Sequence, residues 1–82
     1  MPKLDVEYEG WTNWETYNIH TWIMNYESFY DRMVSERRKA KFTAESAKKL
    51  IQRVFPNGTP DMRSQKHLRK INYEELAEAF NE

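Results

Sequence analysis

The sequence predicts a small all-α domain of three to four helices, preceded by an extended N-terminal arm. Apolar residues recur at helical spacing in several segments, and hydrogen-bonding side chains stand where helices would begin. A strict alternation of apolar and polar residues occurs only near the start, at residues 3–9. A chain of 82 residues is too short for two independent cores. We therefore expect an arm at residues 1–10 and a single helical domain at residues 11–82.

The alternation in the arm has the period of a half-buried strand, with Leu4, Val6 and Tyr8 on one side. No second strand pattern follows in the chain. The segment would then lie along the helices, or it would pair with a second copy or with the sheet edge of another protein. We favour the first alternative, because chain termini often lack regular structure unless they are tied down.

The first predicted helix runs from about residue 13 to residue 25 or 26. Thr12 and Glu15 have the spacing of a capping box at its start. Its apolar residues occur nearly all round, which is typical of a helix that several neighbours contact. We expect this helix to be central, packed by the helix at residues 43–55 and by the C-terminal helix. Asn18 lies among its aromatic residues, and a buried amide needs partners. We expect it to bond the backbone of another segment, such as residues 56–59, and a ligand contact is the alternative.

Three further helical segments are indicated. Ser28 could cap a second helix, which could equally be a continuation of the first after a kink. Thr43 begins the clearest helix, which Pro56-Asn57-Gly58 ends. A short turn could follow at residues 59–61. Asn72, with an acid three positions later, caps the last helix.

The charge is unevenly distributed, although thirteen basic residues balance thirteen acidic ones. Residues 1–31 carry one base and six acids, residues 32–70 carry twelve bases and three acids, and residues 71–82 carry four acids. A basic segment at 32–70 could neutralise the phosphates of a nucleic acid. Alternatively, it forms solvated helix faces with which the acidic ends pair. We favour this second interpretation because no nucleic-acid docking motif accompanies the charge. The candidate phosphate contacts are Arg37, Arg38, Lys39, Lys41, Lys48, Lys49 and Arg53.

The residue types that catalysis and metal binding need are scarce. There is no cysteine, which excludes thiolate zinc sites and cysteine nucleophiles. His20 and His67 lack metalloprotease spacing, and we expect His20 at the edge of the core and His67 in solvent. Two glycines cannot supply a glycine-rich phosphate loop. We expect no enzyme activity, catalytic residue, metal or cofactor, and no small-molecule substrate is evident.

One block carries a resemblance. The stretch from Trp11 to Ile23, WTNWETYNIHTWI, resembles a family of small uncharacterised proteins encoded by bacteriophages and other mobile elements. These share a block reading N-x-E-T-W-N, then three residues, then W-I or W-L. Residues 71–78, INYEELAE, are similar to the family's closing V-[DN]-W-x-E-[IL]-A-E segment. Tyr17 and Tyr73 stand where the family commonly has tryptophan, and His20 and Thr21 are more polar than its usual residues. The resemblance implies a compact helical domain of phage or mobile-element origin and no agreed activity.

We therefore expect a small non-enzymatic binding protein, encoded by a phage, that acts by protein–protein interaction and could modulate a host protein. The partner would be a host protein or a second copy, and a nucleic-acid-binding accessory protein is the alternative function. No segment is long and apolar enough to span a membrane, so we expect a cytoplasmic protein, in the host cell if phage-encoded. Aromatic side chains are common anchors of interfaces. The candidate protein contacts are Val6, Tyr8, Tyr26, Phe29 and Tyr30.

Overall fold

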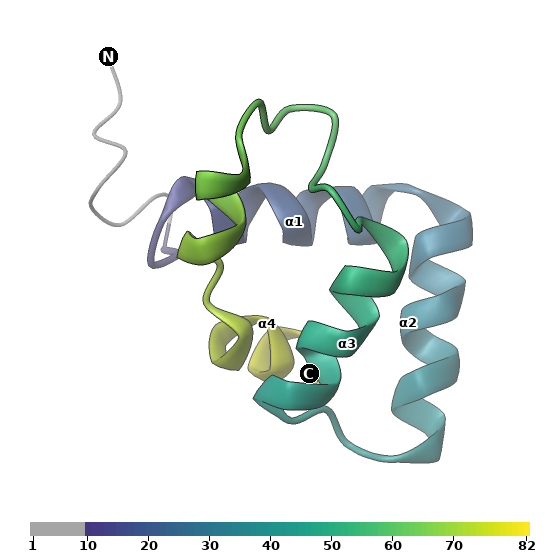
Figure 1. Ribbon diagram of the computed structural model, residues 1–82. Coiled ribbons are helices and arrows are strands. Elements are labelled where there is room, and N and C mark those ends of the chain that lie inside the picture. The colour runs from purple at the N-terminus through teal and green to yellow at the C-terminus, as the bar shows by residue number, and fades with distance from the viewer. Residues whose placement is uncertain (1–9) are drawn as a thin grey trace.

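The structure is a computed structural model that describes residues 10–82 (Figure 1). Every regular element in that part of the chain is a helix, which confirms the all-α class. The elements are α1 (Trp14–Asn25), α2 (Glu27–Lys39), α3 (Ala44–Val54), the 3₁₀-helix η1 (Gln65–Lys70) and α4 (Tyr73–Phe80). The predicted arm lies, apart from Gly10, outside the described residues.

Helices α1 and α4 begin at asparagine caps. The Asn13 side chain accepts a hydrogen bond from the backbone N–H of Thr16 at 2.9 Å, so the cap of α1 is Asn13 and the capping box expected at Thr12 is wrong. Asn72 caps α4 as predicted, by accepting from the backbone N–H of Glu75 at 3.0 Å. Each cap satisfies one of the amides that a helix start leaves without a partner.

The starts of α2 and α3 differ. Thr43 and Ser46 form a reciprocal capping box, which confirms the predicted start of α3. Helix α2 begins after Tyr26 with no side-chain cap, so the cap expected at Ser28 is wrong. Because the backbone of Tyr26 is extended (φ −117°, ψ 119°), the chain turns there and α2 is a helix of its own.

The segment between α3 and α4 holds an element that the pattern does not indicate. A turn occurs at residues 60–61, near the predicted one, and η1 follows at residues 65–70. Gly58 adopts φ +90°, and a Cβ there would lie 3.1 Å from the sulfur of Met62. A side chain at this position is therefore disfavoured by both conformation and space.

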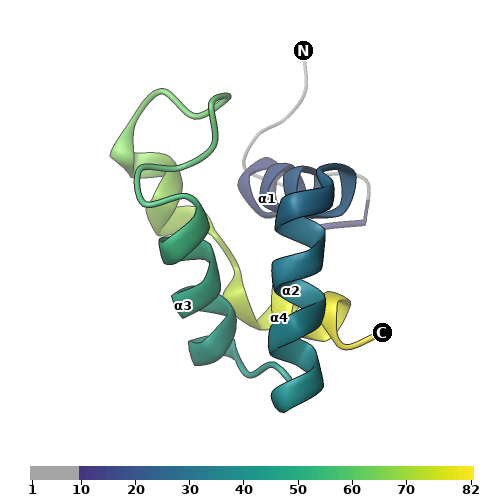
Figure 2. The ribbon, with the colours of Figure 1, turned by 90° about the vertical axis from the view of Figure 1, so that its right-hand side faces the viewer.

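Helix α1 crosses one end of the domain, α2 leads away from it, and α3 leads back toward it (Figures 1 and 2). Helices α2 and α4 and the 3₁₀-helix η1 are the main neighbours of α1, whereas α3 packs chiefly on α4. The predicted central position of α1 agrees with these contacts. Of the predicted helix at residues 43–55, the end at Phe55 contacts α1 through Trp22, and the main packing of α1 is against α2, α4 and η1.

The core fills the space between these helices. Ile19, Ile23, Ala47 and Leu76 have no exposed surface. Because protein interiors are close-packed, each of these side chains makes many close contacts. Phe80 meets Phe42 at 5.2 Å between ring centroids. The remaining buried apolar residues are Met33, Leu50, Ile51, Phe55, Met62, Ile71 and Ala77.

Candidate functional site

Four aromatic rings lie together where α1 turns into α2, and we call Trp22, Tyr26, Phe29 and Phe55 the aromatic corner. Tyr26 stacks on Trp22 with 4.6 Å between centroids and an angle of 14° between the ring planes. Phe29 meets Phe55 edge-on at 4.9 Å, and Trp22 meets Phe55 edge-on at 6.2 Å. Both arrangements are favourable for aromatic pairs. Phe55 is buried and so anchors the cluster to the core.

The predicted protein contacts are only partly exposed at this corner. Tyr26 and Tyr30 are 48% and 39% exposed, large fractions for aromatic residues. Phe29 is half-buried and packs against the core, so less of its ring is accessible than of Tyr26 or Tyr30. Val6 and Tyr8 lie outside the described residues. The structure thus places Tyr26 on the exposed side of the aromatic corner and Phe29 against the core.

A shallow cavity of about 440 Å³ adjoins the aromatic corner. Trp22, Phe29 and Phe55 form part of its wall, and Pro56 and Pro60 of the loop after α3 form another part. The lining is mostly apolar, and the cavity is open to solvent. Such a surface can receive an apolar or aromatic side chain of a partner.

The loop at residues 59–61 is hydrogen-bonded to both Asn18 and Trp22 of α1. The Thr59 hydroxyl donates to the Asn18 side-chain oxygen at 2.5 Å, and the Asn18 amide donates to Asp61 at 2.9 Å. The indole N–H of Trp22 donates to the same Asp61 oxygen at 2.9 Å. These two hydrogen bonds, from Asn18 first and Trp22 second, lower the pKa of Asp61 below its ordinary value.

Asn18 is therefore a structural link, as favoured, but it bonds side chains and not the predicted backbone groups. The buried amide could be found from the sequence because it stands among aromatic residues. Its partner Asp61 could not, since 43 positions separate the two and no local pattern joins them.

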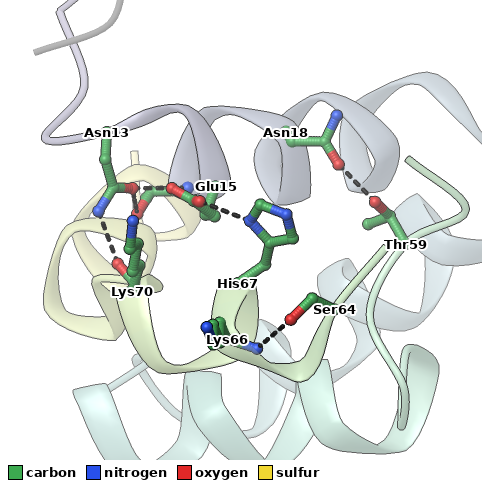
Figure 3. A network of polar contacts seen from close by, with 9 residues as sticks. Asn13, Glu15, Asn18, Thr59, Ser64, Lys66, His67 and Lys70 are labelled. Carbon is green, nitrogen blue, oxygen red and sulfur yellow. Dashed lines mark hydrogen bonds and ion pairs between the residues drawn. The ribbon is translucent and has the colours of Figure 1, made fainter. Parts of the chain in front are cut away.

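A second polar link joins α1 to η1 (Figure 3). The Glu15 carboxylate is 2% exposed, and its Oε2 lies 2.7 Å from Nδ1 of His67. The other oxygen, Oε1, is buried without a hydrogen-bond partner among the described residues. The rings of Trp14 and His67 pack edge to face, with 5.6 Å between their centroids. The expectation that His67 sits in solvent is wrong, because the imidazole is the partner that a buried carboxylate requires.

The polar residues of the block from Trp11 to Ile23 hold the segment that precedes α4. The Asn13 amide donates to the backbone oxygen of Lys70 at 2.7 Å, and the Thr16 hydroxyl accepts from the backbone N–H of Asn72 at 2.9 Å. In Figure 3 the side chains of Asn13, Glu15 and Asn18 all extend from α1 toward residues 59–70. The block thus fastens the irregular part of the chain to the central helix.

The candidate phosphate contacts divide into two groups. Arg37 donates to the backbone oxygens of Phe80 and Glu82 at 2.9 and 3.2 Å, so it secures the C-terminal end and is a poor candidate for phosphate. Lys39 lies 3.7 Å from Glu36 in an exposed ion pair, which contributes little. The other candidate phosphate contacts all have exposed side chains: Arg38, Lys39, Lys41, Lys48, Lys49 and Arg53.

His20 lies at the edge of the core, as predicted, in an open cavity of about 490 Å³. Its ring is 4.6 Å from that of Trp11. Burial lowers the pKa of His20 below its ordinary value, and the charge of Glu82 opposes this shift.

Within residues 10–82 no three side chains of His, Asp or Glu gather in a way that could hold a metal ion.

The comparisons with known proteins identify a family and nothing further. No helix in the described part of the chain is long and apolar enough to cross a membrane. No curated protein and no solved structure matches the chain. A protein-family model described as "Family of unknown function (DUF7249)" matches residues 4–82, nearly the whole chain. The protein therefore belongs to this family of unknown function.

Proposed function

We propose that this protein is a small non-enzymatic binding protein, encoded by a phage, that acts in the host cytoplasm by contacting a host protein. The aromatic corner is the contact surface in this proposal. The observation that carries it is the exposure of Tyr26 beside a mostly apolar cavity. Tyrosine and tryptophan are enriched among the residues that dominate binding energy.

The support beneath Tyr26 favours this role. Tyr26 stacks on Trp22, and Trp22 is held by its hydrogen bond to Asp61. A contact residue that is ordered before binding loses less conformational entropy on association. Tyr26 therefore meets a partner with its ring already supported.

The test is capture of partners by the tagged full-length chain from a lysate of its host, with and without nuclease, followed by affinity measurement on the recovered protein. Tyr26→Ala is expected to weaken binding at least tenfold, as the loss of an interface anchor does. Met24→Ala is the matched control, because Met24 is also exposed (41%) but lines the His20 cavity instead. Equal affinity of wild type and Tyr26→Ala would refute the aromatic corner as the contact surface.

The predicted arm contacts require a separate variant. If Val6 and Tyr8 take part, a chain lacking residues 1–9 binds the same partner less tightly while its circular dichroism spectrum is unchanged. Unchanged affinity of the shortened chain would remove the arm from the proposal and leave the aromatic corner in it.

The second candidate function is nucleic-acid binding. It is favoured by the exposure of Lys48, Lys49 and Arg53 along α3. Phosphate contacts make affinity fall steeply with salt concentration. A double variant, Lys49→Glu with Arg53→Glu, is expected to weaken binding to every sequence, and a salt-independent affinity would exclude this function.

A further inference from the structure

A groove of about 490 Å³ lies between α3 and η1, and we call it the α3–η1 groove. Its apolar floor includes Ile51 and Leu68, and its polar rim includes Lys48, Gln52, Arg69 and Tyr73. The rim residues come from three separate elements, α3, η1 and α4. The contacts of Asn13, Glu15 and Thr16 with residues 67–72 help to hold η1 and the start of α4 in the positions that form the groove.

The charge in this groove is entirely positive. Lys48 and Arg69 line it and no carboxylate does. Within residues 10–82 neither of these two cations forms an ion pair. Cations without nearby carboxylates attract anions, and a concave low-dielectric surface strengthens that attraction. The groove thus fits a ligand that carries negative charge.

The uncharged groups of the groove restrict the ligand further. Tyr73 is half-buried, and its hydroxyl is uncharged at neutral pH because the ordinary pKa of tyrosine is near 10 and burial raises it further. Gln52 supplies an amide that can both donate and accept hydrogen bonds. An aromatic ring, an amide and an apolar floor beside two cations match a flat heterocycle joined to a phosphate.

The groove also continues beyond Tyr73. A second hollow of about 430 Å³ shares Lys48, Gln52 and Tyr73 with it and adds Lys49 and Glu45. The two hollows together form a track along α3 with basic residues at several points. A track of this kind suits a chain of phosphates better than a single small anion.

We propose that the α3–η1 groove binds a nucleotide of a single-stranded nucleic acid. Tyr73 stacks against the base, and Lys48 and Arg69 contact the flanking phosphates. A single strand is favoured over a duplex because an unpaired base exposes its face for stacking, whereas the bases of a duplex are stacked on one another and present only their edges. This inference rests on the second candidate function, nucleic-acid binding.

The experiment measures fluorescence anisotropy of the full-length chain with a labelled twelve-nucleotide single strand and with the same sequence as a duplex. The affinity for the single strand is expected to be at least about tenfold higher than the affinity for the duplex. Arg69→Ala should weaken single-strand binding and reduce the salt dependence by about one phosphate contact. Arg32→Ala is the matched control, because Arg32 is an exposed base on α2 that lies outside the groove and is not one of the candidate phosphate contacts. Its affinity should stay within about twofold of the wild type.

Two variants examine the base contact. Tyr73→Leu is expected to weaken single-strand binding roughly tenfold, which is the usual effect of losing one stacked base. Because Tyr73 also packs against the core, Gln52→Glu is the second variant. Gln52 is exposed on α3, so this change places a negative charge in the groove without disturbing the fold and should also weaken binding about tenfold or more.

The outcomes separate the groove from the general function. Equal affinity for strand and duplex, with no effect of Gln52→Glu or Tyr73→Leu, would overturn the groove and leave phosphate binding by exposed lysines. Tighter binding of a free mononucleotide than of the strand would also overturn the proposed occupant. No binding of either nucleic acid at low salt would overturn both the groove and the second candidate function.

Discussion

Replacing Asn18 by alanine tests the link between α1 and the loop at residues 59–61. The change removes a hydrogen bond from Thr59 and a hydrogen bond to the carboxylate of Asp61. A neutral hydrogen bond contributes about 1 kcal/mol to stability, and one to a charged group contributes about 1.5–3 kcal/mol. The second value needs discounting here because Asp61 is exposed to solvent.

Thr59 adds a further penalty in this variant. It is 2% exposed, so its hydroxyl would lose its acceptor in a place that water does not reach. We expect Asn18→Ala to lower the free energy of unfolding by about 2–3 kcal/mol in total. A chain of this size is stabilised by roughly 4–12 kcal/mol. The domain should therefore still fold, with a clearly reduced stability.

The assay is urea denaturation followed by circular dichroism and by tryptophan fluorescence. With a slope of about 1 kcal/mol per molar urea, the midpoint should fall by about 2–3 M. Asn25→Ala is the control, because Asn25 is exposed at the end of the same helix, and it should change stability by less than about 0.5 kcal/mol.

A double-mutant cycle identifies the contact itself. Asn18→Ala and Thr59→Ala should be non-additive by at least about 0.5 kcal/mol, because the two side chains share one hydrogen bond. Additive effects, or a loss in Asn18→Ala no larger than in Asn25→Ala, would refute the assigned role of Asn18.

Three other predictions concern the core, a cap and pH. Leu76→Ala should lower the free energy of unfolding by about 2–5 kcal/mol in urea denaturation, because the side chain has no exposed surface; a loss under about 1 kcal/mol would contradict the packing. Asn72→Ala should cost about 1 kcal/mol and Asn72→Asp much less, since aspartate also caps a helix start; equal losses in the two variants would argue against the cap. The lowered pKa of His20 means that the folded state binds this proton less readily than the unfolded state. The free energy of unfolding should therefore be unaffected by His20 above about pH 6.5, the ordinary pKa of histidine, and should decline as the pH falls below that value. Thermal melts across this range should show a smaller decline in His20→Gln, and an identical decline would refute the prediction.

Local sequence signals determined the class of fold and much of the helical layout. Thr43 and Asn72 cap α3 and α4 as predicted, because a helix cap depends on residues only three positions apart. The helical spacing of apolar residues likewise indicates the buried face of α4, including Leu76 and Phe80. Such signals act within one or two turns of the chain, and the sequence displays them directly.

Local signals were weak or ambiguous at two places where the sequence-based prediction failed, the cap of α1 and the 3₁₀-helix η1. Thr12 and Asn13 are both good caps, and nothing nearby decides between them. In the folded chain the backbone N–H of Thr12 donates to the Glu75 carboxylate at 3.0 Å, while Asn13 bonds Lys70. The 3₁₀-helix η1 has no buried residue of its own that would give it a periodic pattern. It depends on His67, which a buried glutamate on another helix holds.

The sequence by itself determined that this is a small helical domain with a charged middle, no cysteine and an aromatic first helix. Only the tertiary structure decided which of those residues are accessible. It packed Phe29 against the core and left Tyr26 exposed, engaged Arg37 with the C-terminal end, and brought Arg69 and Tyr73 to α3. The physical reason is that exposure, pairing and cavities depend on contacts between residues tens of positions apart, and composition and periodicity carry no information about which distant residues meet.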